Sequence, residues 1–160
     1  MLLYLVSYNM KPEETLDFHI RWAWHRISKQ YNQEASKHNA SMSHGYILLS
    51  IDQTEGTPST KLGPKMGMEP TSLSRTLKSM EGQGFITRQP DANDKRVVRI
   101  FLTEKGKQHR VFARDAVIRF NESVQTRIPK KKLSVFFDVI SEINQILDNE
   151  DLFEPHEADH

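Results

Sequence analysis

The chain has 160 residues, and its 22 Lys and Arg nearly balance its 21 Asp and Glu, which leaves a formal charge of +1. This length suits one domain with an added oligomerisation element. Because cysteine is absent, the sequence excludes disulfide scaffolds, thiolate metal sites and cysteine nucleophiles. With 37% hydrophobic and 27% charged residues, the chain can form a modest core, and we expect a partner chain to bury further apolar surface.

An apolar stretch occupies residues 1–10. A membrane-spanning helix needs roughly 20 apolar residues, so this stretch is too short to cross a bilayer. It also lacks the basic region and the small-residue cleavage site of a signal peptide. We therefore expect a cytoplasmic protein that binds no membrane, with an N-terminal arm that is frayed or packed on a partner chain.

The two signs of charge are unevenly distributed along the chain. Residues 58–110 contain 11 Lys and Arg against 5 Asp and Glu, a net charge of +6, so the remainder carries −5. A basic centre between acidic ends is typical of a module that binds a polyanion, because phosphate contacts dominate the affinity for nucleic acids. A solvated basic face without a partner remains the alternative.

Residues 1–56 are predicted to contain the arm and a first group of helices. From Pro12 onward, apolar residues follow one face of a helix, namely Leu16, Ile20, Ala23, Trp24, Ile27 and Tyr31. A second stripe of Phe18, Trp22 and His25 favours a helix that packs between two surfaces. Ser43 is the predicted N-cap of a short buried helix that stops at Gly56.

Residues 57–103 are predicted to form a separate lobe that begins with two helices. The Thr57-Pro58 pair is expected to open a short helix that carries Leu62 and Met66, and that a Gly-Pro pair at residues 63–64 distorts. The next helix is predicted to start with Glu69 as N-cap and Pro70 at its first position, and to end at the Gly-Gln-Gly sequence of residues 82–84.

Two strand-like runs complete this lobe, at residues 85–88 and 96–102. The turn-rich residues 89–95 join them into a hairpin. A helix, a turn, a second helix and a hairpin, in this order, form a winged helix. We therefore predict a mainly α fold with a small β-hairpin wing.

Residues 104–148 are predicted to be helical. Thr103 caps a long helix with apolar positions at Phe112, Ala116, Phe120 and Val124, and Pro129 marks the start of another helix. The last helix carries three hydrophobic rows, formed by Leu133, Phe136, Phe137, Val139, Ile140, Ile143, Ile146 and Leu147. Surplus apolar surface on helices at both chain ends favours a homodimer built from those ends. A monomeric helical cap folded back on the centre is the alternative.

The tail of residues 149–160 is polar and is expected to be disordered. His156 and His160 are spaced to bind a divalent metal if the tail is helical, but a disordered end is favoured, so we expect no metal site and no cofactor. None of the seven histidines lies in an H-E-x-x-H motif or near a G-x-S-x-G motif. The sequence therefore predicts a protein that is not an enzyme.

The helix of residues 70–81 carries the main candidate site. Leu73, Leu77 and Met80 form the stripe that must face the core. The opposite side displays hydroxyls and cations, namely Thr71, Ser72, Ser74, Arg75, Lys78 and Ser79. Such a face fits the major groove of DNA, where Arg reads guanine and hydroxyls reach bases or phosphates. An ordinary solvent-facing helix is the alternative, and a protein-binding winged helix would show apolar anchors there instead.

The hairpin tip is the second candidate site. Asp94 lies two residues before Arg96, a spacing that lets the carboxylate orient the guanidinium as it enters a narrow minor groove. Lys95 and Arg88 are expected to contact phosphate. An exposed surface ion pair without a binding role is the alternative.

Four segments of the central part together form one pattern, namely Gly67-Met-Glu-Pro-Thr-Ser-Leu-Ser-Arg-Thr-Leu, Met80-Glu-Gly-Gln-Gly-Phe-Ile, Asp91-Ala-Asn-Asp-Lys-Arg96 and Leu102-Thr-Glu-Lys-Gly106. Through these segments the chain resembles the MarR (multiple antibiotic resistance regulator) family, whose recognition helix is similar to the first segment and whose wing is similar to the third. With the flanking helices, the likeness extends over about residues 12 to 148. The wing together with the last segment is the most specific part of this resemblance.

The resemblance implies a dimeric cytoplasmic winged-helix transcription regulator that binds double-stranded DNA at a pseudo-palindromic operator. It also implies a repressor that a small phenolic or lipophilic ligand releases. By motif match, Arg96 takes the minor-groove role of the wing and Asp94 supports it. The family's ligand pocket would here be lined by His19, Trp22, Arg26 and Phe112. A simple interface core formed by these aromatic residues is the alternative.

Two departures from the family pattern have consequences. Leu62-Gly63-Pro64 replaces the Leu-Ala pair that is usual in the helix before the recognition helix, so we expect that helix to be shorter or bent. Family members that sense oxidants use cysteine, and the absence of cysteine excludes that mode for this chain.

Overall fold

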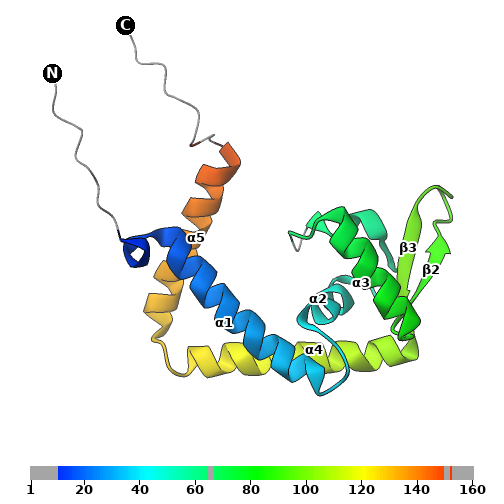
Figure 1. Ribbon diagram of the computed structural model, residues 1–160, viewed down its shortest axis with the longest axis horizontal. Helices are drawn as coiled ribbons and strands as arrows, with labels where there is room; N and C mark the ends of the chain where they lie inside the picture. The colour runs from blue at the N-terminus through cyan, green and yellow to red at the C-terminus, as the bar shows by residue number, and fades with distance from the viewer. Residues whose placement is uncertain (1–10, 65–66, 150–151, 153–160) are drawn as a thin grey trace, which may run out of the picture. The chain divides into compact units, whose positions relative to one another are not determined.

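The computed structural model describes residues 11–64, 67–149 and 152 (Figure 1). The elements are a 3₁₀ helix η1 (Pro12–Glu14), α1 (Leu16–Ser36), α2 (Met42–Ser50), β1 (Thr57–Pro58), a 3₁₀ helix η2 (Ser59–Lys61), α3 (Pro70–Gly82), β2 (Ile86–Pro90), β3 (Val98–Leu102), α4 (Glu104–Gln125) and α5 (Lys130–Asn149). The chain divides within α4 into two compact units, one ending at Ala116 and the other starting at Val117. The expected N-terminal arm, His156 and His160 lie outside the described residues.

These elements confirm the predicted fold class, a mainly α protein with a small winged sheet. In the part of the chain that the structure describes, no helix is long and apolar enough to cross a membrane. The same residues contain no group of three or more His, Asp or Glu side chains suited to hold a metal ion.

The start of α2 differs from the prediction. Ser41, not Ser43, is the N-cap: its backbone is extended, and its hydroxyl accepts a hydrogen bond from the backbone N–H of His44 at 3.2 Å. The preceding helix α1 determines this start, because the side-chain oxygen of Asn32 accepts the N–H of Met42 at 3.0 Å. The helix also ends earlier than Gly56, because the backbone turns extended at Ile51.

The helix expected to open at Thr57-Pro58 is a second correction. Thr57 and Pro58 form a short strand that pairs antiparallel with Ile100 and Arg99 of β3, and only a 3₁₀ turn follows before Leu62. Pro58 is tolerated because β1 is an edge strand of the sheet, whose order is β1-β3-β2. Met66 lies outside the described residues.

The shortened helix before α3 agrees with the departure of the Leu62-Gly63-Pro64 sequence from the family pattern. Leu62 is fully buried and belongs to the core. Gly63 lies so close to α3 that a Cβ there would stand 3.2 Å from a methyl group of Leu73. The glycine therefore permits close packing where the chain does not continue as a helix.

Helix α3 and the hairpin confirm the predicted order. Glu69 is the N-cap residue and Pro70 occupies the first turn, as expected. Strands β2 and β3 pair antiparallel from Ile86 opposite Leu102 to Pro90 opposite Val98. The strand β2 thus includes residues 89–90, which the sequence assigned to the turn, because their partners in β3 extend the ladder.

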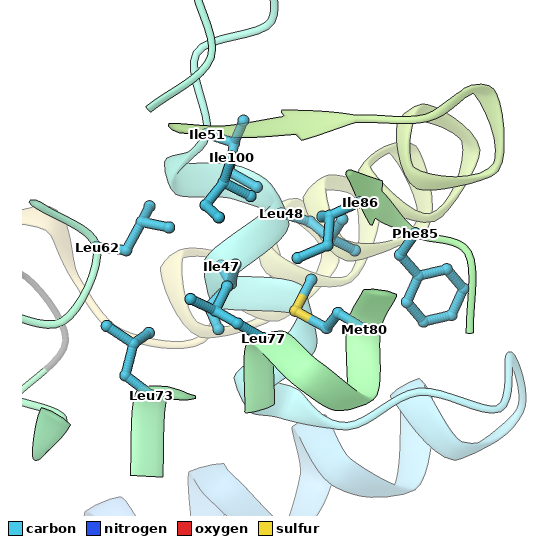
Figure 2. Close-up of a cluster of buried hydrophobic side chains, with 10 residues drawn as sticks. All are labelled: Ile47, Leu48, Ile51, Leu62, Leu73, Leu77, Met80, Phe85, Ile86 and Ile100. Atoms are coloured by element: carbon cyan, nitrogen blue, oxygen red, sulfur yellow. The ribbon is translucent and has the colours of Figure 1, made fainter. Parts of the chain in front are cut away.

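The core of the first unit lies between α2, α3 and the sheet (Figure 2). Its buried side chains are Ile47, Leu48, Ile51, Leu62, Leu73, Leu77, Met80, Phe85, Ile86 and Ile100. The stripe of Leu73, Leu77 and Met80 faces this core, as predicted. Since one face of α3 is buried, the opposite face is directed to solvent.

The two long C-terminal helices begin where the sequence predicted. The hydroxyl of Thr103 accepts the N–H of Gly106 at 3.0 Å and so caps α4. Pro129 directly precedes α5, and its carbonyl accepts the N–H groups of Lys132 and Leu133. None of the residues of α5 is buried in the single chain, and Phe136 is 55% exposed.

The stability of the first unit is expected to depend on pH through a buried histidine, His44. Burial lowers the pKa of His44 in α2, and His109 lowers it further. In the unfolded chain the same side chain titrates near its ordinary value of about 6.5. The unfolded state therefore binds the proton more readily, so stability is kept above that pH and is lost as the pH falls below it.

We expect His44→Phe to weaken this loss of stability between pH 8 and pH 5, because the substitution removes the buried titrating group. The measurement is urea unfolding at several pH values and a fixed chain concentration. His25→Phe is the matched control, since His25 is exposed and stacks on Trp22. An identical pH dependence in the wild type and in both variants would contradict the role of His44.

Candidate nucleic-acid interface

The outer face of α3 presents the polar residues that the sequence predicted there. Thr71, Ser72, Ser74, Arg75, Lys78 and Ser79 are all exposed. Ser79 accepts a hydrogen bond from the side chain of Gln83 at 3.1 Å. Within the described residues 11–64 and 67–149, no carboxylate is paired with Arg75 or Lys78. Both cations are therefore available to an external anion.

The wing carries an arginine that is held in a fixed orientation. The guanidinium of Arg96 donates from Nε to Oδ1 of Asp94 and from Nη2 to Oδ2, both at 3.0 Å. The backbone N–H of Arg96 donates to the same carboxylate at 3.0 Å. The side chain of Arg96 is nevertheless 90% exposed. The fork of Asp94 and Arg96 thus orients a cation that remains accessible to solvent.

The pKa shifts of Asp94 and Arg96 agree with this geometry. The hydrogen bonds from the side chain and then the backbone of Arg96 lower the pKa of Asp94 below its ordinary value. The same carboxylate raises the pKa of Arg96. Asp94 and Arg96 are therefore both ionised at neutral pH. Because these charges are solvated, the pair orients the Arg96 side chain but contributes little to the stability of the fold.

The two remaining predicted phosphate contacts differ in their surroundings. Lys95 is exposed at the tip of the wing. Arg88 in β2 instead contacts Glu81 in α3, with Nε 3.0 Å from Oε2. A sequence reading misses this pair because the turn at residues 83–85 brings the end of α3 back beside β2. Among the described residues, the guanidinium of Arg88, unlike the ammonium of Lys95, is therefore paired with a carboxylate of the protein itself.

Sequence reasoning also missed Arg99 and Asp91, which form an ion pair at the base of the wing with Nη2 2.6 Å from Oδ2. Arg99 alternates with apolar residues in β3, which gave it the pattern of an ordinary solvent-facing strand residue. The only signal was that Asp91 and Arg99 flank the hairpin turn at positions that an antiparallel pair brings close together.

The structure does not bring the four residues of the suggested effector pocket together. His19 Nε2 donates a hydrogen bond to the backbone oxygen of Glu13 at 2.7 Å, and Trp22 stacks on His25. Phe112 of α4 stacks on His38, with ring centroids 4.0 Å apart. His38 lies just beyond the C-terminal end of α1. Because a helix rises about 1.5 Å per residue, Trp22 lies about 20 Å along α1 from that end, and so far from Phe112. Arg26 is exposed on α1.

Helices α2 and α3, the exposed polar face of α3, and the hairpin with its oriented arginine define a winged helix-turn-helix protein. The profile of the MarR family matches residues 41–98. The organic hydroperoxide resistance transcriptional regulator of Bacillus subtilis (strain 168) is 34% identical over 98 residues, which cover 61% of this chain and 67% of the regulator. The chain belongs to the MarR family.

A second relative is the HTH-type transcriptional regulator TtmR of Methylorubrum extorquens (strain PA1), 28% identical over 95 residues that cover 59% of this chain and 49% of TtmR. The chain thus spans from about half to two thirds of the length of these two curated relatives. The matched relatives are named as transcriptional regulators, which confirms the expectation that the chain is not an enzyme.

Solved structures share the fold. The S. aureus MepR–DNA complex superposes with a TM-score of 0.76 at 16% identity, covering 82% of this chain and 97% of MepR. CouR from Rhodococcus jostii RHA1, solved with p-coumaroyl-CoA, gives a TM-score of 0.71 at 20% identity, covering 84% of this chain and 94% of CouR. CouR bound to a 23-mer DNA duplex gives 0.72 at 19% identity, covering 82% and 94%.

Proposed function

We propose that this chain is a homodimeric transcription regulator that acts in the cytoplasm on double-stranded DNA. The observation that carries the proposal is the exposed face of α3, with Arg75 and Lys78 unpaired among the described residues. In a two-fold dimer, two such helices enter successive major grooves of a pseudo-palindrome about 34 to 36 Å apart. Each wing adds Arg96 to a flanking minor groove. The DNA complexes of MepR and CouR support this proposal.

The dimer follows from the apolar surface that the single chain leaves exposed. In α1, Leu16, Trp22 and Trp24 are about half exposed, and in α5 Phe136 and Leu147 are more than half exposed. Exposed apolar surface on this scale marks an interface. A second copy of this chain is the favoured partner, because two-fold homodimers, in which the same patch of each subunit forms the interface, are the commonest oligomers.

The regulation we propose is repression that a small lipophilic or aromatic ligand relieves. The complex of CouR with p-coumaroyl-CoA supports a ligand of this kind. His19, Trp22 and Arg26 on α1 are the proposed lining; Phe112 of the same chain stacks on His38 beyond the other end of α1 and is left out of it. A ligand relieves repression only if it binds more tightly to a dimer whose lobes no longer fit the operator.

Selection of bound sequences from a random DNA pool tests this function. The selection is run at a stated salt concentration, with and without aromatic carboxylates, because salt sets the affinity of any basic protein for DNA. We expect a pseudo-palindrome to be enriched and the ligand to reduce its recovery. A pool without enrichment would favour a winged helix that assembles with proteins instead of DNA.

Arg75→Ala is expected to weaken binding to the selected site by about 1 to 3 kcal/mol and to relax the preference at one base pair, if Arg75 reads a base edge. The measurement is the affinity for the selected site and for its single-base variants. Arg114→Ala removes the same charge from α4, where Arg114 pairs with Asp115, and serves as the control. Equal weakening on all sequences would assign Arg75 to phosphate.

Arg96→Ala is expected to reduce operator affinity by about tenfold or more without unfolding the dimer, because the side chain is exposed. Asp94→Asn is expected to give a smaller loss, since it keeps the cation but removes its orienting partner. Fluorescence anisotropy and thermal melting report the two properties separately. Unchanged affinity of Arg96→Ala for the selected site would refute the wing role.

A further inference from the structure

A second arginine, Arg99, links the wing to the rest of the lobe. Its Nε donates to Oδ2 of Asp91 at 2.8 Å, and its Nη2 lies 2.6 Å from the same oxygen. Asp91 directly follows β2, and its side chain is only 10% exposed, while that of Arg99 is 26% exposed. This pair is thus shielded from solvent, unlike the fork of Asp94 and Arg96.

Asp91 in turn shapes the loop that carries Arg96. Its Oδ1 accepts the backbone N–H of Asn93 at 2.9 Å and that of Asp94 at 3.3 Å. The backbone N–H of Asp91 donates to the carbonyl of Val97 at 2.9 Å. The hydrogen bonds from the backbone of Asn93, the side chain of Arg99 and the backbone of Asp94 lower the pKa of the Asp91 carboxyl group. The carboxylate is therefore the centre of the turn from which the wing arginine projects.

The third nitrogen of Arg99 contacts a different part of the chain. Its Nη1 donates to the backbone oxygens of Glu55 at 3.0 Å and Gly56 at 3.3 Å. These residues precede β1, which is the strand that pairs with β3. Arg99 thus bridges the turn of the wing and the loop before β1.

The loop before β1 is itself held firmly. The carboxylate of Asp52 accepts the N–H groups of Thr54 at 2.8 Å and Glu55 at 2.7 Å. Gly56 has a φ of +64°, and a Cβ there would lie 2.7 Å from the carbonyl of Ile100. Arg110 of α4 donates to the carbonyls of Leu48 and Ile51 just before this loop. The far end of the bridge is therefore a stiff anchor.

We propose that Arg99 is a positioning residue for DNA binding: by joining Asp91 to the loop at residues 55–56, it sets the angle of the wing and so the place where Arg96 meets the minor groove. This inference rests on the proposed DNA-binding function. It requires a planar guanidinium, because Nε must donate to Asp91 while Nη1 donates to the loop in another direction. A lysine supplies the charge as a single ammonium and cannot form the bridge.

The test is a double-mutant cycle between Arg99→Lys and Arg96→Ala in the full chain, measured as affinity for the selected operator. Because Arg99→Lys keeps the charge, we expect it to lose about tenfold in affinity through misplacement of the wing alone. In the Arg96→Ala background the same change is expected to alter affinity by less than about twofold, since the misplaced group is already absent. Hydroxyl-radical footprinting should show lost protection at the flanking minor grooves, with the central protection retained.

Asp91→Asn breaks the bridge from its other end and keeps the test decisive if Arg99→Lys folds poorly. Arg114→Lys is the control, because Arg114 pairs with the adjacent Asp115 and with no other carboxylate among the residues that the structure describes. Additive losses, or full affinity in both Arg99→Lys and Asp91→Asn, would overturn the positioning role while leaving DNA binding intact. Failure of the unmodified chain to prefer any duplex would overturn both the role of Arg99 and the proposed function.

Discussion

Gly106→Ala is expected to lower the free energy of unfolding by about 3 kcal/mol, at the upper end of the usual cost of overpacking a buried site. A Cβ at Gly106 would overlap the carbonyl oxygen of Phe85 and stand 3.0 Å from its carbonyl carbon. That oxygen already accepts the backbone N–H of Thr103 at 3.1 Å and its hydroxyl at 3.2 Å. The added methyl group must therefore separate α4 from the start of β2.

Urea unfolding at a fixed chain concentration measures this effect, because dimerisation makes stability depend on concentration. Gly82→Ala is the matched control: no atom lies within 4 Å of a Cβ there, and the residue is helical. We expect the control to be neutral or more stable by up to about 1 kcal/mol. Equal stabilities for the two variants would show that α4 does not approach β2 as described.

Phe136→Glu is expected to raise the dissociation constant of the dimer by about 100-fold or more. Phe136 lies on the apolar side of α5 and is 55% exposed in the single chain. If the dimer buries this ring, the substitution loses the transfer free energy of a large apolar side chain and places a charge in the interface. Sedimentation velocity over a range of chain concentrations measures the constant.

Gln145→Glu is the control for this substitution, because it adds the same charge to the opposite face of α5. We expect Gln145→Glu to remain dimeric and Phe136→Glu to lose operator binding together with dimerisation. Circular dichroism verifies that both variants keep their helix content. A wild-type chain that is monomeric, or a Phe136→Glu variant that dimerises normally, would rule out α5 as the interface.

The helices and the hairpin could be predicted from local patterns. Apolar spacing indicated α1, α3 and α5, and Thr103 and Pro129 marked helix starts that the structure confirms. Ser43 was the wrong cap because Ser41 and Ser43 are chemically equal candidates, and a side chain of α1, Asn32, decides between them. The strand β1 was missed because its pairing partner Ile100 lies far along the chain.

In the candidate interface too, contacts between residues close in sequence could be predicted, and contacts between distant elements could not. The polar face of α3 and the fork of Asp94 and Arg96 depend on residues close in sequence, and the structure has the predicted geometry at both. The pair of Arg88 and Glu81 and the bridge formed by Arg99 depend on how β2 and β3 fold against other elements. Periodicity and spacing carry no information on such contacts, so a sequence alone could not predict them.

The central claim is that two copies of the α3 face and the wing bind one duplex in a sequence-dependent way. The most direct measurement is the affinity and stoichiometry of the chain with the selected pseudo-palindrome and with a scrambled duplex, at about 0.15 M salt. The account predicts two chains per duplex and a preference of about 1,000-fold or more for the selected site. A monomer that binds both duplexes equally would contradict it.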